Sequence, residues 1–129
     1  NDLRTWASGA RGAWKARMPF EGLNILIVED EPLIGFVLQD LIEEAGGRVV
    51  AHATTLREAE QCAEIEGFDL AILDINLNGE FSYPAARRLA MRNQPFFFVT
   101  GYAHLKVPDD LSGVPVLDKP YTRHAILRT

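Results

Sequence analysis

The sequence predicts a doubly wound α/β fold, in which helices cover both faces of a parallel sheet. Five short apolar runs between residues 23 and 117 have the length and composition of buried strands. Segments with the periodicity of amphipathic helices separate the first four of these runs. Proline, glycine and capping residues stand where those helices would begin and end. Strands that alternate with helices in this way are typical of a parallel sheet buried on both faces.

The first three strands are predicted at residues 23–28, 48–53 and 68–73. Pro32 suits the first turn of the helix after the first strand, and the glycine pair at 46–47 suits its end. The inward face of this helix is predicted from its apolar positions: Leu33, Ile34, Val37, Leu38, Leu41 and Ile42.

The second helix is predicted to begin with a capping box, because Glu58 follows Thr55 by three positions. Cys62, near its end, is expected to be a small buried apolar residue. As the single cysteine of the chain, it cannot form an internal disulfide. The inward face of this helix is predicted to consist of Leu56, Ala59 and Ala63.

The second half of the chain carries a third helix over residues 84–93 and strands at 96–100 and 114–117. The three phenylalanines of strand 96–100 are expected in the core, because a central parallel strand is buried on both faces. Residues 103–113 contain a proline, an aspartate pair and a serine–glycine pair, which predicts a short or mobile fourth helix. A fifth helix is predicted from residue 122 and is truncated by the end of the sequence.

Right-handed crossovers leave few ways to order five parallel strands, and the flavodoxin-like order 2-1-3-4-5 is predicted. This order makes strands one and three neighbours, with their carboxyl ends at the edge where doubly wound folds bind ligands. The domain is predicted over residues 23–129. Residues 1–22 hold two tryptophans, three glycines and no strand pattern, and are interpreted as a leader or linker, with a docking helix as the alternative.

The charge and hydropathy of the chain exclude several classes of function. The formal net charge is −5, and a surface that attracts nucleic-acid phosphates would need basic residues, so direct DNA or RNA binding is not expected. No apolar run approaches the roughly 20 residues that a membrane-spanning helix needs, so no membrane partner is expected. The low cysteine content indicates a cytoplasmic location.

Three carboxylates are predicted to meet at one edge of the sheet. Glu29 and Asp30 follow the first strand, and Asp74 ends the third. Two unit charges about 4 Å apart repel by roughly 4 kcal/mol at an effective dielectric near 20, so a bound cation is expected. Carboxylate and carbonyl oxygens suit Mg²⁺. The alternative, that these acids only cap helices, explains Glu31 but does not explain Asp74.

Two further polar residues are predicted at the same edge. Thr100 closes the fourth strand, and Lys119 follows the fifth. A hydroxyl, an ammonium group and a divalent cation around one carboxylate are typical of a site that handles phosphoryl groups. Asp74 can then be the nucleophile that forms an acyl phosphate. No histidine of the chain is expected near this site: His52, His104 and His124.

Four segments in order, ILIVEDEP, LAILDINLNG, FFFVTGY and VLDKPY, resemble the receiver domain of response regulators, which has a CheY-like fold, over residues 23 to about 127. The resemblance implies that Asp74 is the phosphoacceptor. It implies that Glu29 and Asp30 hold Mg²⁺ together with the backbone carbonyl of Asn76. The hydroxyl of Thr100 and the ammonium group of Lys119 would contact the phosphoryl group.

The segments GEFSYPAARRLA and PFFFVTGY resemble the FATGUY receivers of alphaproteobacteria more closely. Val99 stands where those receivers usually have alanine. Val116 stands where ordinary receivers carry an aromatic switch, and an aliphatic side chain cannot serve as that rotor. Tyr102 is the candidate replacement, with ordinary loop packing as the alternative. Phosphorylation would draw Thr100 towards the acceptor and move Gly101 and Tyr102 with it.

The resemblance implies a phosphoacceptor signalling domain of a two-component phosphorelay, not an enzyme, that promotes its own phosphorylation and dephosphorylation. A histidine kinase or phosphotransfer protein would donate the phosphoryl group. The phosphorylated domain would then contact an unknown output protein or act as a phosphate sink. The alternatives are a receiver fragment of a hybrid histidine kinase and a degenerate receiver. A remote alternative, a haloacid-dehalogenase-type phosphatase, needs a second acid two residues after the nucleophile, where this chain has Asn76.

Overall fold

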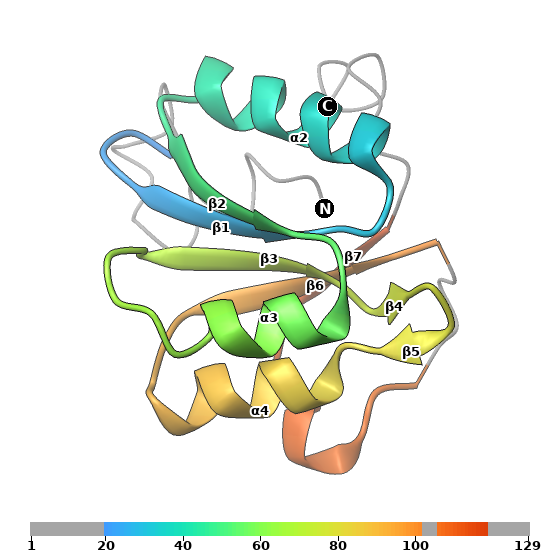
Figure 1. Ribbon diagram of the computed structural model, residues 1–129. Helices are drawn as coiled ribbons and strands as arrows, with labels where there is room; N and C mark the ends of the chain where they lie inside the picture. The colour runs from blue at the N-terminus through green and yellow to red at the C-terminus, as the bar shows by residue number, and fades with distance from the viewer. Residues whose placement is uncertain (1–19, 102–105, 119–129) are drawn as a thin grey trace.

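The protein folds around a central parallel sheet whose strand order is β2-β1-β3-β6-β7 (Figure 1). The computed structural model describes residues 20–101 and 106–118. Counted along the chain, these strands have the predicted order 2-1-3-4-5, which confirms the doubly wound topology. The strands are β1 (Asn24–Val28), β2 (Arg48–Ala53), β3 (Leu70–Asp74), β6 (Phe96–Thr100) and β7 (Val116–Asp118).

The helices cover the two faces of the sheet, as predicted (Figure 1). Helix α2 lies on one face, and helices α3 and α4 lie together on the other (Figure 1). Phe97 packs on the α2 side, whereas Phe96 and Phe98 pack on the α3 and α4 side. Each such buried side chain stabilises the fold by about 1.5–3 kcal/mol. The bounds are α2 (Pro32–Glu44), α3 (Leu56–Cys62) and α4 (Tyr83–Met91).

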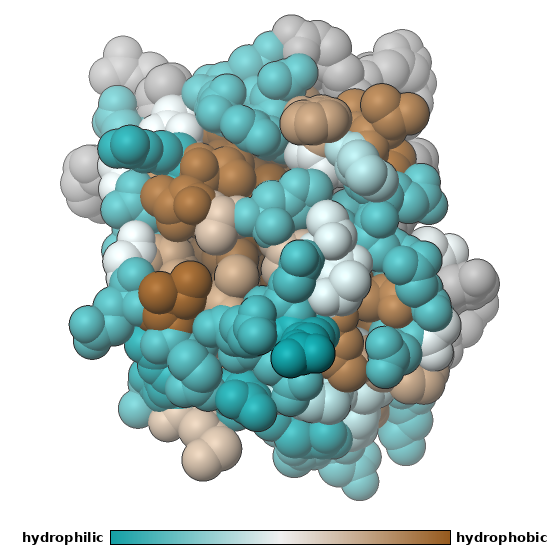
Figure 2. Space-filling view, in the orientation of Figure 1, coloured by the Kyte–Doolittle hydropathy of each residue, from teal (hydrophilic) through white to brown (hydrophobic). Residues whose placement is uncertain are grey.

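Helix α2 begins at Pro32, as predicted, but its buried face is narrower than its apolar sequence indicates. Leu38 and Ile42 are buried, whereas Leu33 is 76% exposed, so the prediction that Leu33 faces inward is wrong. Leu33 and Phe36 lie three positions apart and therefore share the outer side of the helix. On the face of the molecule that Figure 2 draws, apolar side chains form separate patches among hydrophilic ones.

Helix α3 begins with the predicted cap. The hydroxyl of Thr55 accepts from the backbone N–H of Glu58 at 3.1 Å. The Glu58 carboxylate accepts in return from the backbone N–H and the hydroxyl of Thr54, one residue earlier than a standard capping box requires. These hydrogen bonds lower the pKa of Glu58. Cys62 packs against the core cluster beneath α3 and α4 but is only partly buried, so the expectation that it is a buried apolar residue is confirmed in part.

The predicted fourth helix is a single short 3-10 turn, Asp109–Leu111, within the described part of that segment. The carboxylate of Asp110 accepts from Arg87 of α4 at 2.8 Å and 3.3 Å, and Leu111 is buried against the core. The predicted fifth helix, from residue 122, lies outside the described residues.

The core extends into the predicted leader. Phe20 is 1% exposed, and it packs with the apolar residues beneath α2. Its backbone N–H donates to the carbonyl of Ala45 at 3.0 Å. Gly22 also donates its N–H to the carbonyl of Gly46 at 3.3 Å, so two residues before the predicted boundary at 22/23 contact the domain. In the described parts of the chain, no helix is both long and apolar enough to cross a lipid bilayer.

Candidate metal and phosphorylation site

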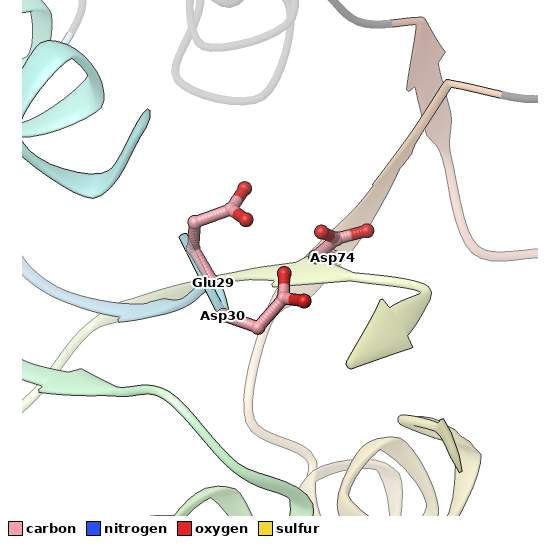
Figure 3. Close-up of side chains that lie close together, drawn as sticks. All are labelled: Glu29, Asp30 and Asp74. Atoms are coloured by element: carbon pink, nitrogen blue, oxygen red, sulfur yellow. The ribbon is translucent and has the colours of Figure 1, made fainter. Parts of the chain in front are cut away.

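Three carboxylates converge at the carboxyl edge of the sheet. Glu29 and Asp30 follow β1, Asp74 ends β3, and one oxygen from each lies within 4.8 Å of the others. Figure 3 shows the three side chains projecting from the ends of these two strands into the same space. Glu29 and Asp74 are 1% and 5% exposed, and Asp30 is half-buried. Sequence reasoning predicted this cluster, and the structure brings it together.

Strand register explains why these acids meet. Val28 and Leu73 are paired in the parallel β1–β3 ladder, so the residues that follow them, Glu29 and Asp74, lie side by side. A parallel ladder keeps both chains running in one direction, so both strands end at the same edge of the sheet.

Backbone N–H groups surround the carboxylates. Asp74 Oδ1 accepts from the N–H of Asn76 at 3.2 Å, and Asp30 Oδ2 accepts from the N–H of Asn78 at 3.1 Å. Glu29 Oε2 accepts from the N–H of Glu31 at 3.2 Å. These donors restrain the three carboxylate side chains at the edge of the sheet.

The loop that carries two of these donors is a small antiparallel hairpin, β4 (Asn76–Leu77) and β5 (Glu80–Phe81), which the sequence did not predict. The side-chain oxygen of Asn76 accepts from the N–H of Gly79 at 2.8 Å. The Asn76 side chain therefore closes the hairpin turn, and its backbone lies next to Asp74.

Aromatic contacts join the hairpin to the core. The rings of Phe81 and Tyr83 stack with centroids 5.1 Å apart, and Tyr83 meets Phe98 edge to face at 5.8 Å. Burial raises the pKa of Tyr83, which keeps its hydroxyl neutral. The loop that faces Asp30 is thus attached to the central strand β6.

Thr100 lies at the same edge of the sheet. It ends β6 and is 3% exposed, and the residue before it, Val99, pairs with Asp74. Gly101 follows and is exposed. Two predicted site residues, Tyr102 and Lys119, lie outside the described residues. Asp118, the residue before Lys119, pairs with Thr100.

One residue beside the site was missed by the sequence analysis. Nε2 of His52 lies 3.1 Å from the backbone carbonyl oxygen of Glu29, so the expectation that no histidine lies near the site is wrong for His52. The other two, His104 and His124, lie outside the described residues.

The donor set fits a hard divalent cation. Three carboxylates within 4.8 Å present only oxygen atoms, which is the ligand type that Mg²⁺ prefers. Carboxylates this close repel one another by several kcal/mol unless a cation or protons balance them. No histidine or cysteine side chain belongs to this cluster of described residues, so zinc-type ligation is not favoured.

A doubly wound sheet with three acids at the carboxyl ends of neighbouring strands fits the receiver class of signalling domains. The chain belongs to the response regulator receiver domain family, whose sequence model matches residues 25–127. The architecture and the predicted CheY-like fold agree with that assignment.

Solved structures of receivers resemble this chain. SdrG from Sphingomonas melonis is 42% identical with a TM-score of 0.68, over 82% of this chain and 91% of SdrG. The receiver domain of PhyR from Erythrobacter litoralis is 29% identical, also at 0.68, over 91% of this chain and 88% of that domain. These similarities confirm the predicted FATGUY-type resemblance.

Curated relatives are longer than this chain. Protein-glutamate methylesterase/protein-glutamine glutaminase 3 of Hahella chejuensis is 31% identical over 96 residues, and the transcriptional regulatory protein PdtaR of Mycobacterium tuberculosis is 28% identical over 103 residues. The matched regions are 74% and 77% of this chain, but only 27% and 50% of those two proteins. The receiver region is what this chain shares with them.

Proposed function

We propose that Asp74 is the phosphoacceptor of this receiver domain, phosphorylated with the help of Mg²⁺. The observation that carries the proposal is the approach of the Glu29, Asp30 and Asp74 carboxylates to within 4.8 Å at the ends of β1 and β3. An isolated acid at a strand end would be an ordinary cap, whereas three acids together form a cation site next to a nucleophile.

The chemistry follows from the residues. A carboxylate oxygen of Asp74 attacks phosphorus, the bond between phosphorus and the donor's histidine nitrogen breaks, and that nitrogen keeps the electron pair. The buried hydroxyl of Thr100 donates to a phosphoryl oxygen. The ammonium group of Lys119 balances the negative charge of the phosphoryl group.

Glu29, Asp30, Asp74 and the backbone carbonyl of Asn76 would hold Mg²⁺. The ion supplies positive charge that offsets the negative charge of the acids and the phosphoryl group. The N–H of Asn76 donates to Asp74 Oδ1 at 3.2 Å. This hydrogen bond fixes the Asn76 backbone next to the acceptor and so supports the proposal that its carbonyl is a Mg²⁺ ligand.

The donor is proposed to be a histidine kinase or a phosphotransfer protein, and the output a contact with another protein. Thr100, Gly101 and Tyr102 would form the switch, because closure of Thr100 on a phosphorylated Asp74 moves the residues directly after it. Similarity to PhyR supports a protein-contact output, since PhyR from Bartonella quintana is described as an anti-anti-sigma factor.

The alternatives are less well supported. A phosphatase of the haloacid-dehalogenase type needs an acid at position 76, and the side chain there is an asparagine whose oxygen bonds the Gly79 N–H. A degenerate receiver would be expected to lose members of the acid cluster, and all three are present. We therefore propose a signalling domain and not an enzyme with a separate substrate.

Intact mass spectrometry after incubation with acetyl phosphate tests the proposal. Wild type should gain one phosphoryl group when Mg²⁺ is present and lose it slowly by hydrolysis. Asp74→Asn should gain none, and chelation of Mg²⁺ should prevent the gain in wild type. An adduct that persists in Asp74→Asn would place the acceptor elsewhere, and no adduct in wild type would indicate a degenerate receiver.

A further inference from the structure

We infer that His52 is a positioning residue for the metal-binding acids, an inference that rests on the proposed function. Its Nε2 atom lies 3.1 Å from the carbonyl oxygen of Glu29. That carbonyl belongs to the peptide group that links Glu29 to Asp30. A hydrogen bond to it therefore restrains the peptide plane between two proposed magnesium ligands.

A β-bulge turns His52 towards this carbonyl. Ile25 pairs with Val49 and Leu26 pairs with Ala51, so Val50 is an extra residue in β2. Side chains alternate between the faces of a strand, and one extra residue reverses the alternation after it.

The packing of β2 shows this reversal. Val49 packs with the core cluster beneath α2, whereas Ala51 and Ala53 pack with the cluster beneath α3 and α4. Without the bulge, these three residues would share one face. His52 is consequently on the α2 side, where its ring meets Gly35 of that helix.

Gly35 makes room for the imidazole ring. A Cβ atom at this position would lie 2.2 Å from Cε1 of His52 and 2.8 Å from Nε2, so no larger residue fits without moving the ring. Glycine inside a helix costs about 1 kcal/mol relative to alanine, so its presence here needs a packing reason. The close approach of His52 provides that reason.

Strand β2 contacts both backbone polar groups of Glu29. The N–H of Glu29 donates to the carbonyl of Ala53 at 2.9 Å. The carbonyl of Glu29 lies 3.1 Å from His52 Nε2, one residue before β2 ends at Ala53. The last two residues of β2 thus contact the Glu29 backbone, one through a main-chain carbonyl and the other through a ring.

The ionisation state of His52 does not enter this role. A carbonyl oxygen only accepts, so Nε2 must carry the hydrogen, which it does in one neutral tautomer and in the cation. The hydrogen bond is therefore available in both charge states of the ring.

Magnesium titrations of His52→Leu and His52→Gln test the inference. Leucine fills the space without a donor, whereas the amide nitrogen of glutamine can reach a similar position. Binding is followed by the backbone amide NMR signals of Glu29, Asp30 and Asp74, and stability by urea unfolding of the same samples. His52→Leu should bind Mg²⁺ about ten-fold more weakly than wild type, and His52→Gln within two-fold of it.

Equal magnesium affinity in wild type and His52→Leu would overturn the inference, as would equal weakening in the two variants. Gln39→Ala, on the same helix as Gly35 but away from the site, is the control and should leave affinity unchanged. If wild type itself shows no magnesium-dependent shift at Glu29 or Asp30, the proposed function fails, which differs from a failure confined to His52.

Two measurements keep the inference testable if His52→Leu folds poorly. Nitrogen-15 NMR of the wild-type imidazole should show the hydrogen on Nε2, and a hydrogen only on Nδ1 would contradict the inference. Gly35→Ala should weaken magnesium binding in wild type but not in a His52→Ala background, where the added methyl has room. Equal effects in both backgrounds would show that the ring and Glu29 are not coupled.

Discussion

The backbone N–H of Asn78 donates to Oδ2 of Asp30 at 3.1 Å, across 48 positions of the sequence. This hydrogen bond joins the β4–β5 hairpin to the loop after β1. The hairpin turn is therefore part of the acidic site. A change in the hairpin backbone should shift the position of Asp30, one of the proposed magnesium ligands.

Gly79→Ala should weaken magnesium binding and destabilise the domain by about 1–2 kcal/mol, because a side chain is strained at positive φ. Gly79 has φ +90°, and a Cβ there would meet nothing within 4 Å, so strain is the only cost. Urea unfolding and a magnesium titration measure the two effects. Gly113→Ala is the matched control, since its backbone lies outside that φ range. Equal effects of the two substitutions would contradict this prediction.

Asp30→Asn should stabilise the magnesium-free protein by about 1 kcal/mol, because it removes one of three clustered charges from a half-buried site. The asparagine oxygen can still accept from Asn78. Magnesium should stabilise wild type more than the variant, so the difference should shrink or reverse when the ion is added. Thermal unfolding with and without Mg²⁺ measures this. A variant that is less stable than wild type without the ion would show that repulsion does not dominate.

Ser82→Ala should leave stability unchanged or raise it by up to about 1 kcal/mol. The Ser82 hydroxyl is fully buried and makes no hydrogen bond among the described residues, so its removal relieves a desolvation cost. Thr55→Ala is the contrasting variant and should cost about 1 kcal/mol, because its hydroxyl caps α3. A clear destabilisation by Ser82→Ala in urea unfolding would refute the prediction.

The Glu58 carboxylate should make stability depend on pH in the acid range. Hydrogen bonds from Thr54 lower its pKa in the folded state below the usual value of 4.5. The stabilisation is therefore complete above pH 4.5 and is lost as pH falls through the lower folded value. Wild type should be more stable than Glu58→Gln at neutral pH, and the difference should shrink as pH falls through the folded pKa of Glu58. A constant difference between them would contradict the assignment.

The elements of the fold were predictable where burial alone defines them. The predicted strand at 96–100 agrees with β6, whose five residues are all buried. The predicted strand at 48–53 agrees with β2, an edge strand in which Val49, Ala51 and Ala53 pack against the core. Leu33 was misplaced because an apolar residue can stay exposed on the outer side of a helix. The hairpin after β3 escaped notice because four residues form it, too few for a periodic pattern.

The site was predictable as far as strand ends define it. Glu29, Asp30, Asp74 and Thr100 each stand at the end of a strand, and parallel topology brings such ends together. His52 could not be found in the same way, because the extra residue at Val50 reverses the strand faces without a sequence signal of its own. Gly35 was a usable signal, since an unexplained glycine within a helix indicates a close contact.

Borohydride reduction of the phosphorylated protein, followed by peptide mass mapping, tests the central claim most directly. Hydride cleaves an aspartyl phosphate to the alcohol, so the modified residue is marked permanently. After treatment with acetyl phosphate and Mg²⁺, the account predicts homoserine at position 74 and unmodified carboxylates at positions 29 and 30. Reduction at either of those two acids, or at no acid in protein that carries the phosphoryl mass, would contradict it.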